Sequence, residues 1–164
     1  MHIQKVTEND NLNAIGEIYA QSWKAAYQGM VPQDYLDGLV GSRWANVLGD
    51  SQYDAYVILE DEKYIGTSSI CAARDEKMVE WGEIVSIYLL PEYFGRGYAG
   101  PLFTCVINAL RGKGYTNIYL WVLKENIRAQ KFYEKHGFHK SGDTAFIEIA
   151  GEELAEIRYV KNIT

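Results

Sequence analysis

The sequence predicts an α+β domain with a mixed, mostly antiparallel, twisted sheet of about seven strands and about four helices. Three strand-like stretches, at 55–60, 64–73 and 78–90, are separated by short charged turns, a pattern typical of an antiparallel meander. A glycine turn and a helical stretch then lead to another apolar segment at 116–122. Strand, helix and strand at this spacing favour a right-handed crossover, so this segment is expected to lie parallel to the preceding strand. A chain of 164 residues is expected to form one domain, residues 1–164.

The N-terminal third is predicted to be mainly helical. Residues 2–6 alternate weakly in polarity and are expected to form the first strand. Apolar side chains at helical spacing predict a helix over 12–27, and one of the residues 9–11 is expected to cap it. Two shorter helices are expected at about 32–39 and 42–48.

Aromatic side chains are concentrated in this helical region, where Trp23, Tyr27, Tyr35 and Trp44 occur within a short span. Aromatic residues at helical spacing most often fill a core. The functional alternative is a lid, in which Trp23 and Tyr27 form the wall of a pocket for an acceptor substrate. The pattern leaves both interpretations open.

The turn after the strand at 78–90 carries the most informative motif. Three glycines lie within residues 95–100, where they allow positive φ and a close approach of a ligand to the backbone. A helical pattern over 98–111 follows, and Pro101 falls in its first turn, where a missing N–H breaks no helical bond. Unpaired N–H groups and the helix dipole favour an anion there, most often a phosphate. We therefore predict a phosphate cradle at 95–100, with an ordinary strand-to-helix turn as the alternative.

The remainder of the chain is predicted to alternate between strand and helix. The segment 116–122 is almost continuously apolar, as expected for a strand buried on both faces. A helix is expected over 127–136, followed by Gly137 as its stop signal. Two strands, at about 138–149 and 154–161, complete the predicted sheet.

The formal net charge of −6 argues against general nucleic-acid binding, which requires a basic face. An acidic surface mildly favours a small cationic substrate through electrostatic steering. Around the glycine turn, Arg96, Arg111 and Lys113 outnumber Glu92, which predicts a locally basic patch for a polyanionic ligand. Ordinary solvated surface charge is the alternative interpretation.

Cysteine and hydropathy patterns indicate the expected compartment. Cys71 and Cys105 lie in apolar surroundings without metal-type spacing and are expected to be reduced core thiols. No apolar stretch is long enough to span a bilayer, and no basic and then apolar N-terminal segment indicates secretion. We therefore expect a soluble cytoplasmic protein that binds no membrane. The histidines have no ligand spacing, so no metal is expected.

Two other classes of phosphate-binding loop are alternatives for this turn. Gly95-x-Gly97-x-x-Gly100 also satisfies the dinucleotide fingerprint, and Glu125 lies roughly where an acid would bind a ribose. The dinucleotide fold, however, places this motif after its first strand and has further βαβ units on each side, whereas a meander precedes it here. A nicotinamide-dependent enzyme is therefore the less favoured alternative. A nucleotide triphosphatase loop is excluded because no Gly-Lys-Ser/Thr follows.

Two separated motifs give the chain a family resemblance. They are Phe94-Gly95-Arg96-Gly97-Tyr98-Ala99 and Asn126-x-x-Ala129-x-x-Phe132-Tyr133-Glu134-Lys135-x-Gly137-Phe138. Both are similar to motifs of the GNAT acyl-CoA-dependent N-acyltransferases, and the resemblance is clearest over residues 55–140. Gly97 and Ala99 match the glycine signature of that family, while Phe94 stands where a polar residue is usual. The resemblance implies the three-layer α/β/α GNAT fold.

The resemblance also implies how acetyl-CoA is held. The pyrophosphate would lie against the turn formed by Gly95, Arg96, Gly97, Tyr98, Ala99 and Gly100. The pantetheine arm would pair like an added strand with the backbone of Ile87, Tyr88 and Leu89. A backbone N–H near Tyr88 would face the thioester oxygen as an oxyanion donor. Asn126 matches the asparagine that hydrogen-bonds the pantetheine arm, with a plain N-cap as its structural alternative.

Two catalytic residues are expected from the same resemblance. Tyr133 matches the position whose hydroxyl protonates the departing thiolate, and a phenol has a suitable pKa for that step. Glu83 lies where some family members have a general base, and it is expected to act on the amine through an ordered water. Strand alternation places Glu83 on the same face as Ile87 and Leu89. A packing aromatic and a solvated acid are the respective alternatives.

The sequence therefore predicts an enzyme that moves an acetyl group from acetyl-CoA to a primary amine by direct attack in a ternary complex. A covalent intermediate is disfavoured because neither cysteine has a histidine base beside it. The sequence does not decide which acceptor is used: a small amine, a polyamine, an aminoglycoside, an amino acid and a protein N-terminus all remain candidates. A non-catalytic CoA-binding sensor is a further alternative, and a homodimer is also left open.

Overall fold

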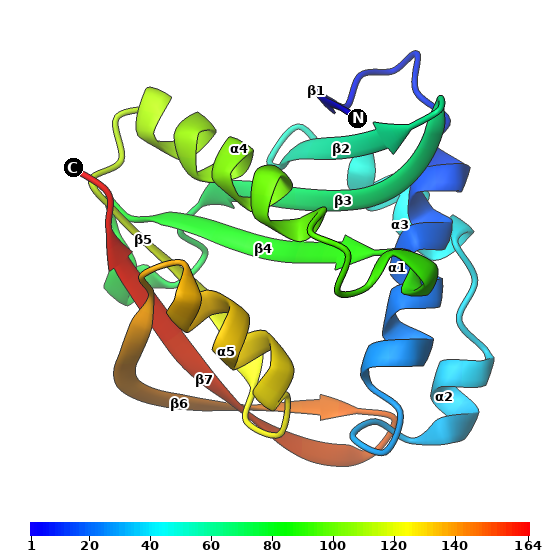
Figure 1. Ribbon diagram of the computed structural model, residues 1–164. Coiled ribbons are helices and arrows are strands. Elements are labelled where there is room, and N and C mark those ends of the chain that lie inside the picture. Colours follow the sequence, from blue (N-terminus) through cyan, green and yellow to red (C-terminus); the bar gives the residue numbers. More distant parts are fainter.

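The computed structural model describes residues 1–164, which form a mixed seven-stranded sheet in the order β1-β2-β3-β4-β5-β7-β6 (Figure 1). The strands are β1 (His2–Lys5), β2 (Asp54–Glu60), β3 (Lys63–Ala72), β4 (Gly82–Leu89), β5 (Asn117–Leu123), β6 (His139–Ile149) and β7 (Glu152–Asn162). The helices are α1 (Leu12–Ala26), α2 (Gln33–Asp37), α3 (Ser42–Leu48), α4 (Ala99–Gly112) and α5 (Ile127–Lys135), and the 3₁₀ turns are η1 (Glu76–Met78) and η2 (Pro91–Tyr93).

The predicted topology is confirmed. Strands β2, β3 and β4 form an antiparallel meander, and β5 lies parallel to β4. There are five α-helices rather than about four. Strand β4 begins at Gly82, four residues later than predicted at Met78, because η1 and the positive φ of +76° at Glu80 interrupt the extended backbone. Asn11 is the residue that caps α1, accepting a hydrogen bond from the Ala14 N–H at 3.1 Å.

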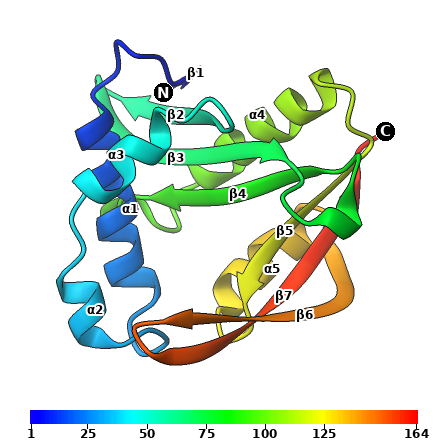
Figure 2. The same cartoon turned by 180° about the vertical axis from the view of Figure 1, so that it is seen from behind.

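The helices cover both faces of the sheet, as Figures 1 and 2 show. Helices α4 and α5 bury their apolar sides against one face, where Phe103, Val106 and Tyr133 belong to the largest core cluster. Helices α1 and α2 pack over the opposite face, with Leu36 and Leu123 in a second cluster. No helix is both long and apolar enough to cross a membrane. Cys71 and Cys105 are free thiols, the first buried and the second partly exposed.

Strands β4 and β5 are neighbours along only part of their length. They pair at Gly82 with Ile118 and at Glu83 with Tyr119, whereas β5 pairs with β7 along its whole length. The two strands then separate, as both views of the ribbon show. One backbone edge of β4 beyond Glu83 is therefore unpaired within the sheet.

A bulge in β4 changes which side chains share a face. Ile84 and Ser86 pair with consecutive residues of β3, so Val85 between them is an extra residue. Strict alternation predicted that Glu83 shares a face with Ile87. The extra residue exchanges the faces, so Ile87 packs with Ile84 on the side of α4 and α5, while Glu83 bonds to Tyr119 on the other side. The predicted grouping was therefore wrong.

Candidate active site

The cavity between β4 and β5 brings most of the predicted site residues together. Its volume is about 320 Å³, and it is lined from both faces of the sheet. The predicted residues that line it are Trp23, Tyr27, Glu83, Ile87, Tyr88, Leu89, Ala99, Asn126 and Tyr133. The remaining predicted residues do not line it: Gly95 to Tyr98 form the turn between two lining residues, Phe94 and Ala99, and Gly100 is the second residue of α4.

The glycine turn has the geometry of an anion site. Gly95 and Gly97 have φ values of +70° and +88°, and a Cβ on either would meet no protein atom within 4 Å. None of the backbone N–H groups from Gly95 to Gly100 donates to another protein group, and the N-cap residue Tyr98 makes no side-chain cap bond. Open donors at the start of a 14-residue helix fit a phosphate group.

The charge around this turn differs from the prediction. Arg111 donates to the Ile163 carbonyl and Lys113 pairs with Asp54, both at the C-terminal end of α4, so the predicted basic patch was wrong for these two residues. Arg128 supplies a cation instead, since its guanidinium lies 4.6 Å from the centre of the Phe94 ring and lines the cavity. The sequence signal for Arg128 was its place in the first turn of α5, directly after Ile127.

The open edge of β4 presents particular amides to the cavity. The Leu90 N–H donates to the Ile65 carbonyl of β3, so alternation directs the Tyr88 N–H toward β3 as well. The N–H groups of Ile87 and Leu89 then face the side from which β5 has separated. A backbone N–H near Tyr88 that faces the cavity would therefore belong to Ile87 or Leu89, and the expected oxyanion role stays a prediction.

Tyr133 is buried in the cavity wall between aromatic side chains. Only 9% of its surface is exposed, and its ring lies 5.7 Å from that of Phe103. The hydroxyl has no hydrogen-bond partner in the protein, although the side chain lines the cavity. Burial, with a smaller contribution from Tyr88, raises the pKa of Tyr133 above its usual value. The group therefore stays protonated at neutral pH and is free to donate.

Asn126 holds the start of α5. Its side-chain oxygen accepts a hydrogen bond from the Ala129 N–H at 3.2 Å, which is the N-cap role foreseen as the structural alternative. The side-chain NH₂ makes no such bond, and the residue lines the cavity. The side-chain oxygen of Asn126 therefore caps the helix, while its NH₂ group stays available to donate to a ligand.

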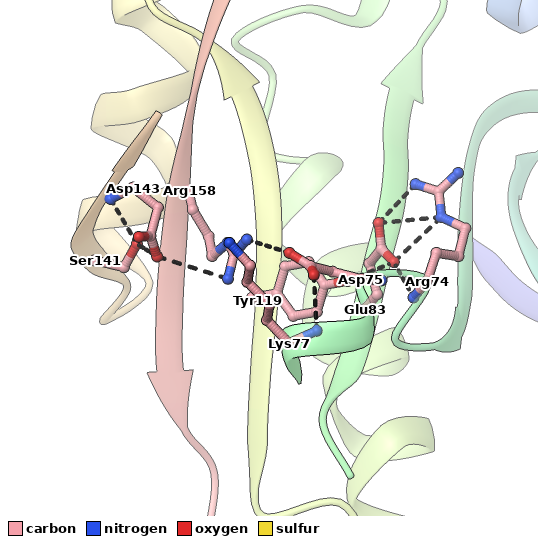
Figure 3. A network of polar contacts seen from close by, with 8 residues as sticks. All are labelled: Arg74, Asp75, Lys77, Glu83, Tyr119, Ser141, Asp143 and Arg158. Atoms are coloured by element: carbon pink, nitrogen blue, oxygen red, sulfur yellow. Dashed lines mark hydrogen bonds and ion pairs between the residues drawn. The ribbon is translucent and has the colours of Figure 1, made fainter. Parts of the chain in front are cut away.

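Glu83 is held in a polar network (Figure 3). Its carboxylate accepts from the Arg74 side chain at 2.6 Å, from the Arg74 backbone N–H at 3.0 Å and from the Tyr119 hydroxyl at 2.8 Å. Burial alone would raise the pKa of Glu83, but the bonds and charge of Arg74 and the Tyr119 bond outweigh it and hold the pKa below its ordinary value. Figure 3 also shows the second ion pair of this network, between Asp75 and Arg158.

The face toward α1 and β7 forms an aromatic and acidic wall. Trp23 and Tyr27 lie 4.8 Å apart edge to face, and both line the cavity with Trp121. They also pack beside the second core cluster, so the core interpretation of these aromatics is confirmed, and their role as the wall of an acceptor pocket stays a prediction. Glu156 on β7 completes the wall and was missed, because a single acid in a strand-like segment is no signal of a site. No group of three or more His, Cys, Asp or Glu is placed to hold a metal.

Known proteins resemble this chain over most of its length. A family model described as the acetyltransferase (GNAT) family matches residues 12–138. The uncharacterized N-acetyltransferase YuaI of Bacillus subtilis (strain 168) is 26% identical over 150 residues, or 90% of this chain and 86% of that protein. The spermidine N(1)-acetyltransferase of Thermoplasma acidophilum is 23% identical over 147 residues, or 84% of this chain and 88% of that protein.

A solved structure gives the same architecture. The PaiA N-acetyltransferase of Thermoplasma acidophilum, crystallised in complex with coenzyme A, matches this fold with a TM-score of 0.74 at 20% identity. The match covers 99% of this chain and 100% of that chain, so the whole fold is shared.

Proposed function

The chain belongs to the GNAT family of acetyltransferases, and from this premise we propose that it transfers the acetyl group of acetyl-CoA to a primary amine by direct attack in a ternary complex. The observation that carries the proposal is the cavity through the sheet, which has open backbone amides at one end and an aromatic, acidic wall at the other. Donor and acceptor can therefore approach the same point from opposite faces.

The donor side would bind acetyl-CoA mainly through backbone groups. The turn of Gly95 to Gly100 would hold the pyrophosphate, and the Arg128 guanidinium beside it would add positive charge where Phe94 offers no polar contact. The β4 edge at Ile87 to Leu89 and the Asn126 amide would hold the pantetheine arm. Bound acetyl-CoA supplies an activated thioester, and the cofactor in the PaiA structure supports this choice of donor.

The chemistry requires a polarised carbonyl and a protonated leaving group. An N–H of Ile87 or Leu89 would donate to the developing oxyanion, a type of contact that is worth about 3 kcal/mol in other enzymes. Tyr133 would give its hydroxyl proton to the departing thiolate, since burial keeps the phenol protonated. Glu83 was predicted as the base that takes the ammonium proton, but its bonds to Arg74 and Tyr119 argue against that role.

The acceptor is proposed to be a small cationic amine. Trp23 and Tyr27 offer aromatic faces, which attract ammonium groups, and Glu83 and Glu156 add carboxylates to the same wall. The similarity to a spermidine N(1)-acetyltransferase supports a polyamine as the first acceptor to test. A protein N-terminal amine is the other candidate acceptor.

Ligand-dependent stability tests the donor. At ~100 times its dissociation constant, a ligand stabilises the fold by ~2.7 kcal/mol. For a domain of this size each kcal/mol raises the melting temperature by about 2–4 °C. We expect this shift with acetyl-CoA and none with NAD; a shift with NAD alone would favour a nicotinamide-dependent enzyme.

Turnover with a mixed amine panel, followed by mass spectrometry, tests the acceptor. A mass gain of one acetyl group on an amine is the expected result. Stabilisation by acetyl-CoA without acetylation of any amine would favour a CoA-binding sensor instead.

A further inference from the structure

Glu156 lies on the acceptor side of the cavity. It is half-buried in β7, where it pairs with Leu123 of β5 on one side and Ala145 of β6 on the other. Its side chain lines the same cavity as Trp23, Tyr27 and the thioester-facing edge of β4. A cationic amine that occupies the cavity from this face would therefore lie near Glu156.

The carboxylate of Glu156 is uncommitted. It makes no hydrogen bond or ion pair with another residue, although its neighbours include the charged groups Arg74 and Glu83 and the phenol Tyr27. Burial raises the pKa of Glu156, Arg74 lowers it and Glu83 raises it, with a net increase above the ordinary value. Arg158, two residues along on the same face, is paired with Asp75 and Asp143 rather than with Glu156.

Glu83 has the opposite surroundings. Arg74 and Tyr119 saturate its carboxylate with hydrogen bonds, and only 3% of its side chain is exposed (Figure 3). A base must have a free lone pair within reach of the proton that it takes. Glu83 has its oxygens occupied and its pKa lowered, whereas Glu156 has free oxygens and a raised pKa.

We infer that Glu156, and not Glu83, binds the acceptor ammonium and acts as its general base, an assignment that rests on the acetyl transfer proposed above. Glu156 takes one proton from the ammonium and leaves a neutral amine with its lone pair free. The nitrogen then forms the C–N bond and the C–S bond breaks. Tyr133 gives its proton to the departing thiolate and regains one from the attacking nitrogen. Glu156 releases its proton to water, so the products are the amide, the thiol and one proton.

The test measures acetyl transfer by full-length protein to the best amine of the panel as a function of pH. In the wild type, kcat/KM for the amine should reach a plateau above the raised pKa of Glu156. In Glu156→Gln the plateau should disappear, and kcat/KM should rise steadily with pH toward the pKa of the free amine. General bases typically contribute 10²–10⁴-fold, so we expect a loss of about 100-fold or more at neutral pH.

Glu153→Gln is the matched control, because it removes the same charge from an exposed position of the same strand. It should keep the wild-type profile. Stabilisation of Glu156→Gln by acetyl-CoA should be unchanged, which separates loss of the base from loss of folding or donor binding. A wild-type profile in Glu156→Gln would overturn the inference while leaving the proposed function intact, whereas a wild type that acetylates no amine would overturn both.

The basicity of the acceptor provides a second measurement. A fluorinated analogue of the same amine is largely unprotonated at neutral pH and needs no base to free its lone pair. Glu156→Gln should therefore lose much less activity with this analogue than with the parent amine. Equal losses with both amines would contradict a proton-transfer role for Glu156.

Discussion

The two ends of the cavity are built in different ways. At the donor end, on the side of α4 and α5, the proposed contacts are mainly backbone N–H groups of residues 95–100 and of the β4 edge. At the acceptor end, the wall is made of side chains such as Trp23, Tyr27 and Glu156 that come from separate elements. Substitutions at the donor end should therefore act through backbone conformation and phosphate affinity. Substitutions at the acceptor end should change the charge of the wall, the pH dependence of turnover and the selectivity for the amine.

Tyr133 lies between the two ends, and its replacement should have the largest effect. Tyr133→Phe removes only the hydroxyl, which has no partner within the protein, so packing against Phe103 should be kept. If this hydroxyl protonates the thiolate, kcat should fall by about 10²–10⁴-fold. Single-turnover kinetics with acetyl-CoA affinity measured in parallel would check this. Unchanged turnover would remove Tyr133 from the mechanism.

The donor end is tested most directly by Gly97→Val. The new Cβ meets no protein atom, but Gly97 has a φ of +88°, so the loop must distort or the side chain must fill the space proposed for the pyrophosphate. Loss of two charge-assisted hydrogen bonds, each worth about 1.5–3 kcal/mol, predicts at least about 100-fold weaker coenzyme A binding, measurable by calorimetry.

Gly142→Val is the matched control for that experiment. Gly142 has a φ of +94° and equally open surroundings, but it lies in β6 outside the cavity lining. The Gly142→Val variant should have the same backbone strain as Gly97→Val but bind coenzyme A as tightly as the wild type. Equal affinity losses in both variants would mean that strain, and not the cradle, explains the effect.

The contrast between the two ends also explains what could be read from the sequence. The proposed donor cradle depends on glycines and a helix start within one short segment, so local pattern alone predicted the open turn. The Val85 bulge, by contrast, has no local signal, and it reversed the predicted face of Glu83. The ion pair of Glu83 with Arg74 depends on the register of β3 against β4, and the position of Glu156 depends on β7 becoming the neighbour of β5; periodicity specifies neither.

Arg128 tests whether the donor end needs any side-chain charge. Its guanidinium is exposed and lies over Phe94, so Arg128→Ala should weaken coenzyme A binding by about tenfold, the value of one partly screened charge-assisted contact. Lys131→Ala, also exposed on α5 but outside the cavity, is the control. The difference between the two variants should shrink as salt is added. If both variants bind equally well in dilute buffer, the backbone alone holds the pyrophosphate.

The smallest expected effect concerns Glu83, which we assign to the structure of the acceptor end rather than to its chemistry. Its pKa is lowered in the folded protein, so the ion pair with Arg74 stabilises the fold above the unfolded-state pKa, and this contribution is lost as pH falls through the folded pKa. Because Arg74 is nearly half exposed, the contribution should be at most about 1 kcal/mol, or roughly 2–4 °C in melting temperature.

The contribution of the Glu83–Arg74 ion pair is isolated by comparing the melting temperatures of wild type and Glu83→Gln at neutral and at acidic pH, because the other carboxylates are common to both proteins. The difference between the two proteins should narrow as the pH falls. In Glu83→Gln the rise of kcat/KM to a plateau should persist because Glu156 keeps its proton-accepting role, and it should move to lower pH because the charge of Glu83 no longer raises the pKa of Glu156. Loss of this plateau in Glu83→Gln, with a constant stability difference, would instead make Glu83 the base, and its carboxylate would then have to leave Arg74 before each turnover.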